Sequence, residues 1–176
     1  EWPSDGGVVA GVEEAAGLLD LLVAEMVRRD AAGHNLPVLI VAIDELADLL
    51  QAGGRRVGEA LTRLTQRGRE AGIHVVAATQ RPAATLLGGL AKANFPVRLV
   101  GSVVSPEDAK IAAGVGGTGA ERLLGRGDFV LVAKGQVIRF QAAYAGNSEM
   151  EAIVARVRAG GRRRRTWQPA QLQLAA

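Results

Sequence analysis

The most constraining feature of the chain is a run of large aliphatic residues that ends in two adjacent acids. Residues 36–50 read LPVLIVAIDELADLL, and residues 38–43 are all aliphatic. A strand covered on both faces is continuously aliphatic, whereas a half-exposed strand alternates apolar and polar residues. We therefore expect residues 38–43 to be a central strand of a parallel α/β sheet, with Asp44 and Glu45 at its carboxyl end.

These two acids, Asp44 and Glu45, stand where parallel sheets bind their ligands. Ligands of open α/β sheets lie beyond the carboxyl ends of the strands, and a carboxylate that loses water there needs a positive partner. Nucleotide-hydrolysing enzymes use such acids, in the Walker B pattern, to manage Mg²⁺ and an attacking water. The alternative is that both acids belong to the first turn of the next helix, where they complement the helix dipole.

A second aliphatic strand also ends in polar residues, and this favours the first interpretation. A helical stretch, 57–71, precedes an aliphatic strand at 73–78, which runs into the polar cluster TQRP at 79–82. Two neighbouring strands of one sheet are thus expected to end in polar chemistry.

Four linked segments resemble the motor domain of the FtsK/SpoIIIE DNA translocases, within the FtsK–HerA group of ring ATPases. They are IDELADLL, LTRLTQRGREAGIHVVAATQRP, LAKANFPVRL and AERLLGRGDFVL, within a resemblance from about Leu18 to about Gly160. Such a linked set is more specific than any one motif. The resemblance implies an α/β fold, part of a RecA-like P-loop NTPase core, with a mainly parallel sheet flanked by helices and an antiparallel hairpin at one edge.

A phosphate-binding loop of the form GxxxxGK[ST] does not occur in the sequence. Backbone N–H groups and the lysine of that loop hold the β- and γ-phosphates. In the resembled family the loop lies ahead of the segment where this chain begins. We therefore expect residues 1–160 to be the carboxy-terminal part of the motor domain, inactive as an ATPase on its own, and residues 161–176 to be a disordered basic tail.

The resemblance implies roles for residues at the two strand ends. Asp44 would hold Mg²⁺ through water, and Glu45 would orient or deprotonate the water that attacks the γ-phosphate of ATP. Gln80 would contact that phosphate or water as a sensor, and Thr79 would also bind nucleotide. For Gln80 the alternative is a polar cap on a helix begun by Pro82.

Arg69 matches the position from which similar translocases supply an arginine finger to the ATP site of a neighbouring subunit. The resemblance therefore implies a homo-oligomeric ring, a hexamer, with ATP sites between subunits. The alternative is a solvated helix face on which Arg63, Arg67 and Glu70 pair at i,i+3 or i,i+4 spacing.

Basic residues match the pore loops that follow the DNA backbone in the family, at Arg81, Lys92, Arg98 and Lys110. Phosphate contacts read no sequence, which suits a motor that moves along any DNA. Pro106 departs from the family pattern, because a lysine is expected there. Aromatic residues make up 3% of the chain, which argues against base-stacking platforms for single strands. Double-stranded DNA is the expected partner.

Composition excludes other classes of protein. The chain of 176 residues has no cysteine and two histidines, so neither disulfides nor a thiolate or zinc site can form. No apolar run reaches the roughly 18 residues that span a bilayer, and we expect no membrane contact from this segment and a cytoplasmic location.

The remaining elements are predicted from periodicity and turn residues. The GxGxxG pattern at 114–119 follows a helix start, not a strand, and predicts a surface turn. Lys134 and Gly135 give a hairpin signal between strands 128–133 and 136–142. Further elements are expected at 12–29 (helix), 97–103 (strand) and 149–158 (helix).

We expect the chain to serve ATP-driven translocation of double-stranded DNA, in chromosome or plasmid segregation or transfer. Two alternatives remain open. One is a catalytically silent DNA-binding or ring-scaffold module, since the chain has no P-loop motif. The other is a secretion or conjugation ATPase of the same superfamily.

Overall fold

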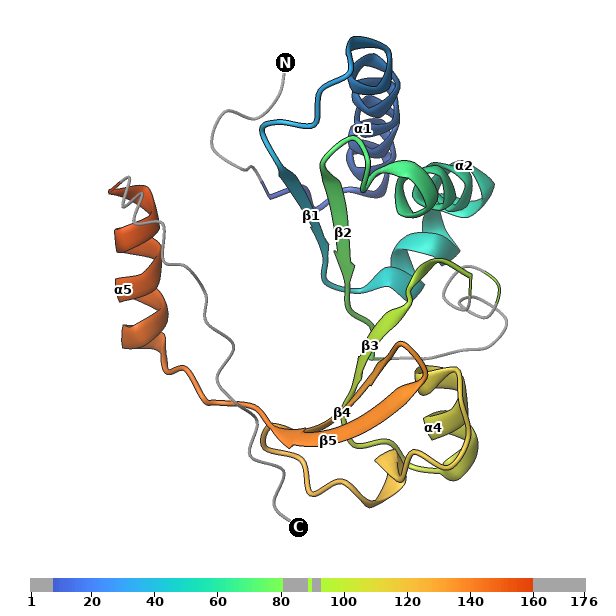
Figure 1. The fold of residues 1–176 in the computed structure, drawn as a ribbon, viewed down its shortest axis with the longest axis vertical. Coiled ribbons are helices and arrows are strands. Elements are labelled where there is room, and N and C mark those ends of the chain that lie inside the picture. The colour runs from blue at the N-terminus through green and yellow to red at the C-terminus, as the bar shows by residue number, and fades with distance from the viewer. Residues whose placement is uncertain (1–7, 81–88, 90–92, 160–176) are drawn as a thin grey trace. The chain divides into compact units, whose positions relative to one another are not determined.

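The computed structural model describes residues 8–80, 89 and 93–159 (Figure 1). The chain forms two compact units, Glu1–Gln141 and Ala142–Ala176. The boundary expected at residue 160 stays a prediction, because residues 161–176 lie outside the described part. The helices and strands are α1 (Val12–Ala32), β1 (Leu39–Ile43), α2 (Leu46–Arg67), β2 (Ile73–Ala77), β3 (Val97–Val100), α4 (Pro106–Ala113), η1 (Ala120–Arg122), β4 (Asp128–Ala133), β5 (Gln136–Gln141) and, in the second unit, α5 (Asn147–Arg158).

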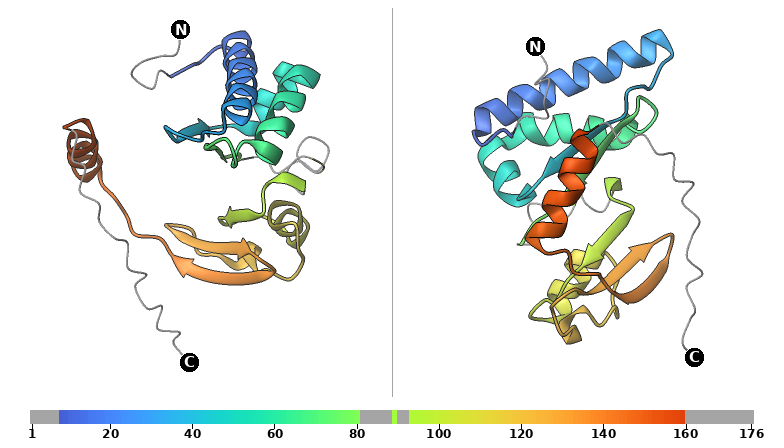
Figure 2. Two further views of the ribbon diagram at one scale, coloured as in Figure 1. Left: turned by 45° about the horizontal axis from the view of Figure 1, so that its top comes forward. Right: turned by 90° about the vertical axis from the view of Figure 1, so that its left-hand side faces the viewer.

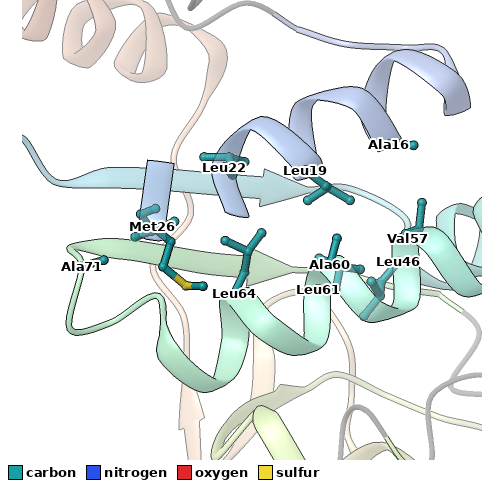
Figure 3. Packing of buried hydrophobic residues seen from close by; sticks show 11 residues of the cluster. Ala16, Leu19, Leu22, Met26, Leu46, Val57, Ala60, Leu61, Leu64 and Ala71 are labelled. Atoms are coloured by element: carbon teal, nitrogen blue, oxygen red, sulfur yellow. The ribbon is translucent and has the colours of Figure 1, made fainter. Parts of the chain in front are cut away.

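Helices α1 and α2 cover one face of a parallel sheet made of β1 and β2 (Figures 1 and 2). The register pairs Leu39 with Ile73 and Ile43 with Ala77. Apolar residues recur at helical spacing along both helices, and Figure 3 shows how their side chains meet above the strands. The buried members of this core are Ala16, Leu19, Leu22, Met26, Leu46, Val57, Ala60, Leu61, Leu64, Ala71 and Ile73. The predicted α/β class and parallel pairing are confirmed.

The opposite face of the β1–β2 sheet is exposed, which differs from the expected strand covered on both faces. Ile40 is 72% exposed and Val76 is 61% exposed. Burial alternates along β1 because both helices pack on the same face and none of the described elements of the first unit covers the other. The continuous aliphatic run therefore leaves an apolar surface on this part of the chain.

Helix α2 begins directly after Glu45, well before the predicted start at residue 57. Its interior is interrupted at Gly54, where φ is 54° and ψ is −143°. This conformation is not helical and is readily adopted only by glycine. The Gly53–Gly54 pair interrupts the apolar pattern, so the sequence signals only the second segment of the helix.

The second sheet of the first unit is antiparallel, with strand order β3-β4-β5. The predicted hairpin turn is confirmed, because Lys134 and Gly135 both have positive φ, 50° and 75°. The hairpin extends β3 and not the edge of the parallel β1–β2 sheet. The predicted turn at 114–119 is also confirmed, since it joins α4 to η1 and has Gly114 at φ 75° and Gly119 at φ 74°.

A buried arginine joins α1 to the two loops that precede the parallel strands. Arg29 is 2% exposed. Its guanidinium donates to Glu25 Oε1 at 2.7 Å, to Pro37 O at 2.7 Å and to Ala71 O at 2.9 Å. Both carbonyls lie just before a strand, so this one side chain fixes where β1 and β2 start relative to α1.

Replacing Arg29 with Met should lower the free energy of unfolding by about 2–4 kcal/mol, because it removes a buried hydrogen bond to Ala71 O and a part-buried one to Pro37 O. Arg28→Met is the matched control. Arg28 shares the Glu25 carboxylate but is exposed, so its loss should change stability little. Urea denaturation of both variants checks this, and equal effects would contradict the role given to Arg29.

Glu25 should make stability depend on pH in the acid range. Its hydrogen bonds from Arg28 and Arg29 lower its pKa from 4.5 to about 2. A lowered pKa adds stability that is fully present above pH 4.5 and is lost as the pH falls toward about 2. Glu25→Gln should therefore flatten the stability curve in this window. It should not abolish the slope, because Asp128, held by Arg139 and the Leu124 N–H, has its pKa lowered from 3.8 to about 2.

Candidate nucleotide site

The carboxyl ends of β1 and β2 are held side by side by backbone hydrogen bonds that continue past both strands. The N–H of Ala78 donates to Ile43 O at 2.8 Å, and the N–H of Leu46 donates to Ala78 O at 2.8 Å. The two bonds lie on either side of the acids that follow β1, and Ala78, which takes part in both, directly precedes the polar residues that follow β2. The predicted meeting of two polar strand ends is therefore present in the fold.

The Glu45 side chain joins the two strand ends. Its Oε1 accepts a hydrogen bond from the Thr79 hydroxyl, and its Oε2 accepts one from the N–H of Gln80 at 2.8 Å. Oε1 also accepts from the N–H of Ala47 at 3.4 Å, because Glu45 is the N-cap of α2. Glu45 therefore stands at the start of the next helix, as the alternative interpretation expected, and its side chain also lies at the ends of the two strands.

Asp44 differs from its neighbour because its side chain is exposed. Within residues 8–80, 89 and 93–159 its carboxylate has no hydrogen-bond or ion-pair partner. The same residues contain no group of three or more His, Cys, Asp or Glu side chains that could hold a metal. A single free carboxylate fits Mg²⁺, which keeps several waters and is bound through one or two carboxylates together with phosphate oxygens.

Arg69 lies at the other end of β2, in the turn that connects α2 to this strand. The N–H of Gly72 donates to Arg69 O at 3.1 Å, and the N–H of Ile73 donates to Gly68 O at 2.7 Å. The Arg69 side chain is exposed and forms no ion pair with any residue that the structure describes. Arg67, by contrast, donates to Asp30 Oδ2 at 2.8 Å.

The two described positions expected to contact DNA have different surroundings. Lys110 is exposed in the last turn of α4. Arg98 is half-buried, where its guanidinium donates to Phe95 O at 3.1 Å and Ala112 O at 3.2 Å, and burial lowers its pKa. Arg81 and Lys92 lie outside the described residues.

Pro106 opens helix α4, which accounts for proline at a position where lysine was expected. The helix has Ser105 as its N-cap, and the Ser105 hydroxyl accepts from the N–H of Asp108 at 3.1 Å. Proline suits the first turn of a helix because its fixed φ is helical and its missing N–H would have no helical partner there.

Residues 5–84 match the FtsK/SpoIIIE family. This segment contains both acids after β1, the turn arginine Arg69, and Thr79 and Gln80 after β2. This segment belongs to the FtsK/SpoIIIE family.

Curated relatives extend the similarity over most of the chain. The DNA translocase FtsK of Staphylococcus aureus (strain Mu50 / ATCC 700699) is 36% identical over 84% of this chain and 22% of its own length. FtsK of Listeria monocytogenes is 37% identical over 84% of this chain and 23% of its length. FtsK of Leptospira interrogans is 41% identical over 73% of this chain and 14% of its own length. The chain thus spans between 14% and 23% of the length of these FtsK proteins.

Solved structures confirm the RecA-like fold. The pCW3 conjugation coupling protein TcpA, a monomer form with ATPγS, has a TM-score of 0.74 and 26% identity, over 86% of this chain and 50% of TcpA. The cytoplasmic domain of the Thermomonospora curvata type VII secretion ATPase EccC has a TM-score of 0.63 and 24% identity, over 80% of this chain and 19% of that protein. The second likeness concerns the fold alone.

Among the residues described, none of the helices is both long and apolar enough to span a membrane.

Removing the Glu45 side chain should destabilise the fold, whereas neutralising its neighbour should not. Glu45→Ala removes an N-cap and two hydrogen bonds that join β1 to β2, with an expected loss of about 1–2 kcal/mol. Asp44→Asn changes an exposed side chain without a partner in the described structure and should leave stability unchanged. Urea denaturation of the two variants checks the difference, and a larger loss for Asp44→Asn would contradict the assigned geometry.

Proposed function

We propose that this chain forms part of an ATP-driven motor that moves double-stranded DNA, in chromosome or plasmid segregation or transfer. The observation that carries the proposal is the joined pair of strand ends, where Glu45 is held by donors from β2 while Asp44 stays exposed and available. One acid is thus fixed in place and the other is open to a hydrated cation. Hydrolysis of a phosphoanhydride by water uses both a residue that positions the water and a metal ion that neutralises charge on the phosphates.

The residues at the strand ends take distinct roles in this proposal. Glu45 accepts a proton from the attacking water, or orients that water, through its carboxylate. Asp44 would hold Mg²⁺ through the water molecules around the ion. Bound Mg²⁺ would neutralise charge on the β- and γ-phosphate oxygens. Gln80, directly after the Thr79 anchor, would contact the same water or phosphate through its side-chain amide.

Arg69 serves a neighbouring subunit and not its own. Arg69 precedes β2 and Glu45 follows β1, so the whole length of a five-residue strand, about 17 Å, lies between them. An arginine side chain is much shorter than this strand, so Arg69 cannot reach the site of its own chain. An exposed arginine without a partner in the described structure is instead available to a head-to-tail neighbour, and such contacts close into rings. We propose a hexamer.

DNA contact in this proposal is made by basic side chains that reach phosphates. Lys110 is exposed and free to do so, while the intramolecular hydrogen bonds of Arg98 limit its reach to solvent. Arg81 and Lys92 remain proposed contacts on the strength of the family pattern. Such contacts are electrostatic and carry no sequence preference, so binding should weaken steeply as salt is raised.

Two other functions compete with this proposal. The structural neighbours TcpA and EccC are named for conjugation and for type VII secretion, so a conjugation or secretion ATPase shares this core. A catalytically silent DNA-binding or ring-scaffold module is the other, since the sequence contains no GxxxxGK[ST] motif. The exposed Asp44 and the anchored Glu45 support an active motor over a silent one.

The proposal predicts ATP hydrolysis that depends on DNA and on Glu45. In the full-length protein, Glu45→Gln should lower DNA-stimulated turnover by about 10²-fold or more, because the amide cannot accept the water proton. Glu59→Gln, at an exposed acid of α2, is the matched control and should keep full activity. Hydrolysis is measured by phosphate release with and without duplex DNA.

Each outcome of that measurement discriminates between the functions. DNA binding without turnover in the unaltered protein would favour the silent module. Turnover that DNA does not stimulate would favour a secretion ATPase.

The placement of Arg69 predicts complementation between two inactive variants. Arg69→Ala and Glu45→Gln should each be inactive alone, since each lacks one half of every site. Mixed rings contain sites that combine Glu45 of the first variant with Arg69 of the second, so mixing should restore part of the activity. Arg67→Ala is the control and should stay active, because Arg67 is paired with Asp30. Failure to recover any turnover in mixed rings would contradict an arginine supplied between subunits.

A further inference from the structure

The Thr79 hydroxyl donates its hydrogen bond to the Glu45 carboxylate. We propose that Thr79 is a positioning residue, which together with the N–H of Gln80 sets the direction in which Glu45 faces the attacking water. This inference rests on the function proposed above, and it gives Thr79 a different role from the nucleotide contact expected from the sequence.

The two donors hold Glu45 by different oxygens. Thr79 donates to Oε1 and the N–H of Gln80 donates to Oε2, both from the end of β2. Rotation about the last torsion of a glutamate is otherwise broad, and two anchors on two oxygens restrict it. An ionised carboxylate has about four acceptor sites, so anchoring by two donors from β2 is compatible with accepting from water. Without the hydroxyl, Oε1 loses the donor from β2 and retains the longer contact from the N–H of Ala47.

A nucleotide contact and the bond to Glu45 compete for the same proton. A threonine hydroxyl has one proton to donate, and both the carboxylate and the phosphate oxygens are acceptors. While Thr79 donates to Glu45 it cannot donate to a phosphate. The two roles therefore differ in what they change: a phosphate ligand affects ATP affinity, whereas a positioning residue affects turnover.

The test compares Thr79→Val with Thr79→Ser in the full-length protein. Valine has nearly the same shape but no hydroxyl, so kcat should fall about tenfold or more, while the KM for ATP and the affinity for a fluorescent ATP analogue stay within about twofold. Serine keeps the hydroxyl and should restore most of kcat. Thr62→Val is the matched control. It removes the hydrogen bond of a half-buried α2 threonine to Gly58 O, 2.7 Å long, and should leave kcat unchanged.

A second readout does not depend on activity. Hydrogen exchange at the Gln80 amide should be faster in Thr79→Val than in the unaltered protein, because Glu45, its acceptor, loses one of its anchors. If valine prevents folding, Thr79→Ala, which cannot overpack the site, is measured for the same kcat, ATP affinity and amide exchange.

Two results would overturn the inference. Loss of ATP affinity at unchanged kcat would make Thr79 a nucleotide ligand, and a rise in DNA-independent hydrolysis would make it a restraint on Glu45. Glu45→Gln separates this inference from the proposed function. If Glu45→Gln abolishes turnover while Thr79→Val keeps it, only the inference fails. If Glu45→Gln retains turnover, the proposed function fails as well.

Discussion

The parallel pairing of β1 with β2 is the constraint on which the rest of the account depends. It places Glu45 and Thr79, which are 34 residues apart in the chain, together at the carboxyl ends of the two strands. The same pairing places the turn that contains Arg69 at the opposite end of the strands. In the proposed function, one sheet therefore separates the carboxylate that activates water from an arginine that acts on another chain. This separation is the physical reason to propose a ring.

The helices support this pairing from one side. Leucines and Met26 of α1 pack on α2 over the strands, and Arg29 fixes the loops in which both strands begin. Because Glu45 also caps α2, a movement of that helix would move the carboxylate. The break at Gly54 divides α2 into a short segment next to Glu45 and a longer segment packed on α1.

Sequence reasoning predicts the parts that repeat a local pattern. The aliphatic strands, the hairpin at Lys134 and the acids after β1 follow from periodicity and turn chemistry, and the family resemblance adds the role of Arg69. The bond between Thr79 and Glu45 could not be predicted, since a contact between distant residues leaves no mark on either local pattern. The burial of Arg29 could not be predicted for another reason. Arginines are rarely buried, and burial is favourable here because the guanidinium has three acceptors. The prediction that β1 is covered on both faces was wrong, because an aliphatic run does not show whether an element packs on each face of the strand.

The central claim is that hydrolysis at Glu45 drives movement along duplex DNA. The most direct measurement is displacement of a third strand from a DNA triplex by the full-length protein, with and without ATP. The account predicts displacement that requires ATP and is absent in Glu45→Gln, although that variant still binds the duplex. Hydrolysis and duplex binding without any displacement by the unaltered protein would contradict it.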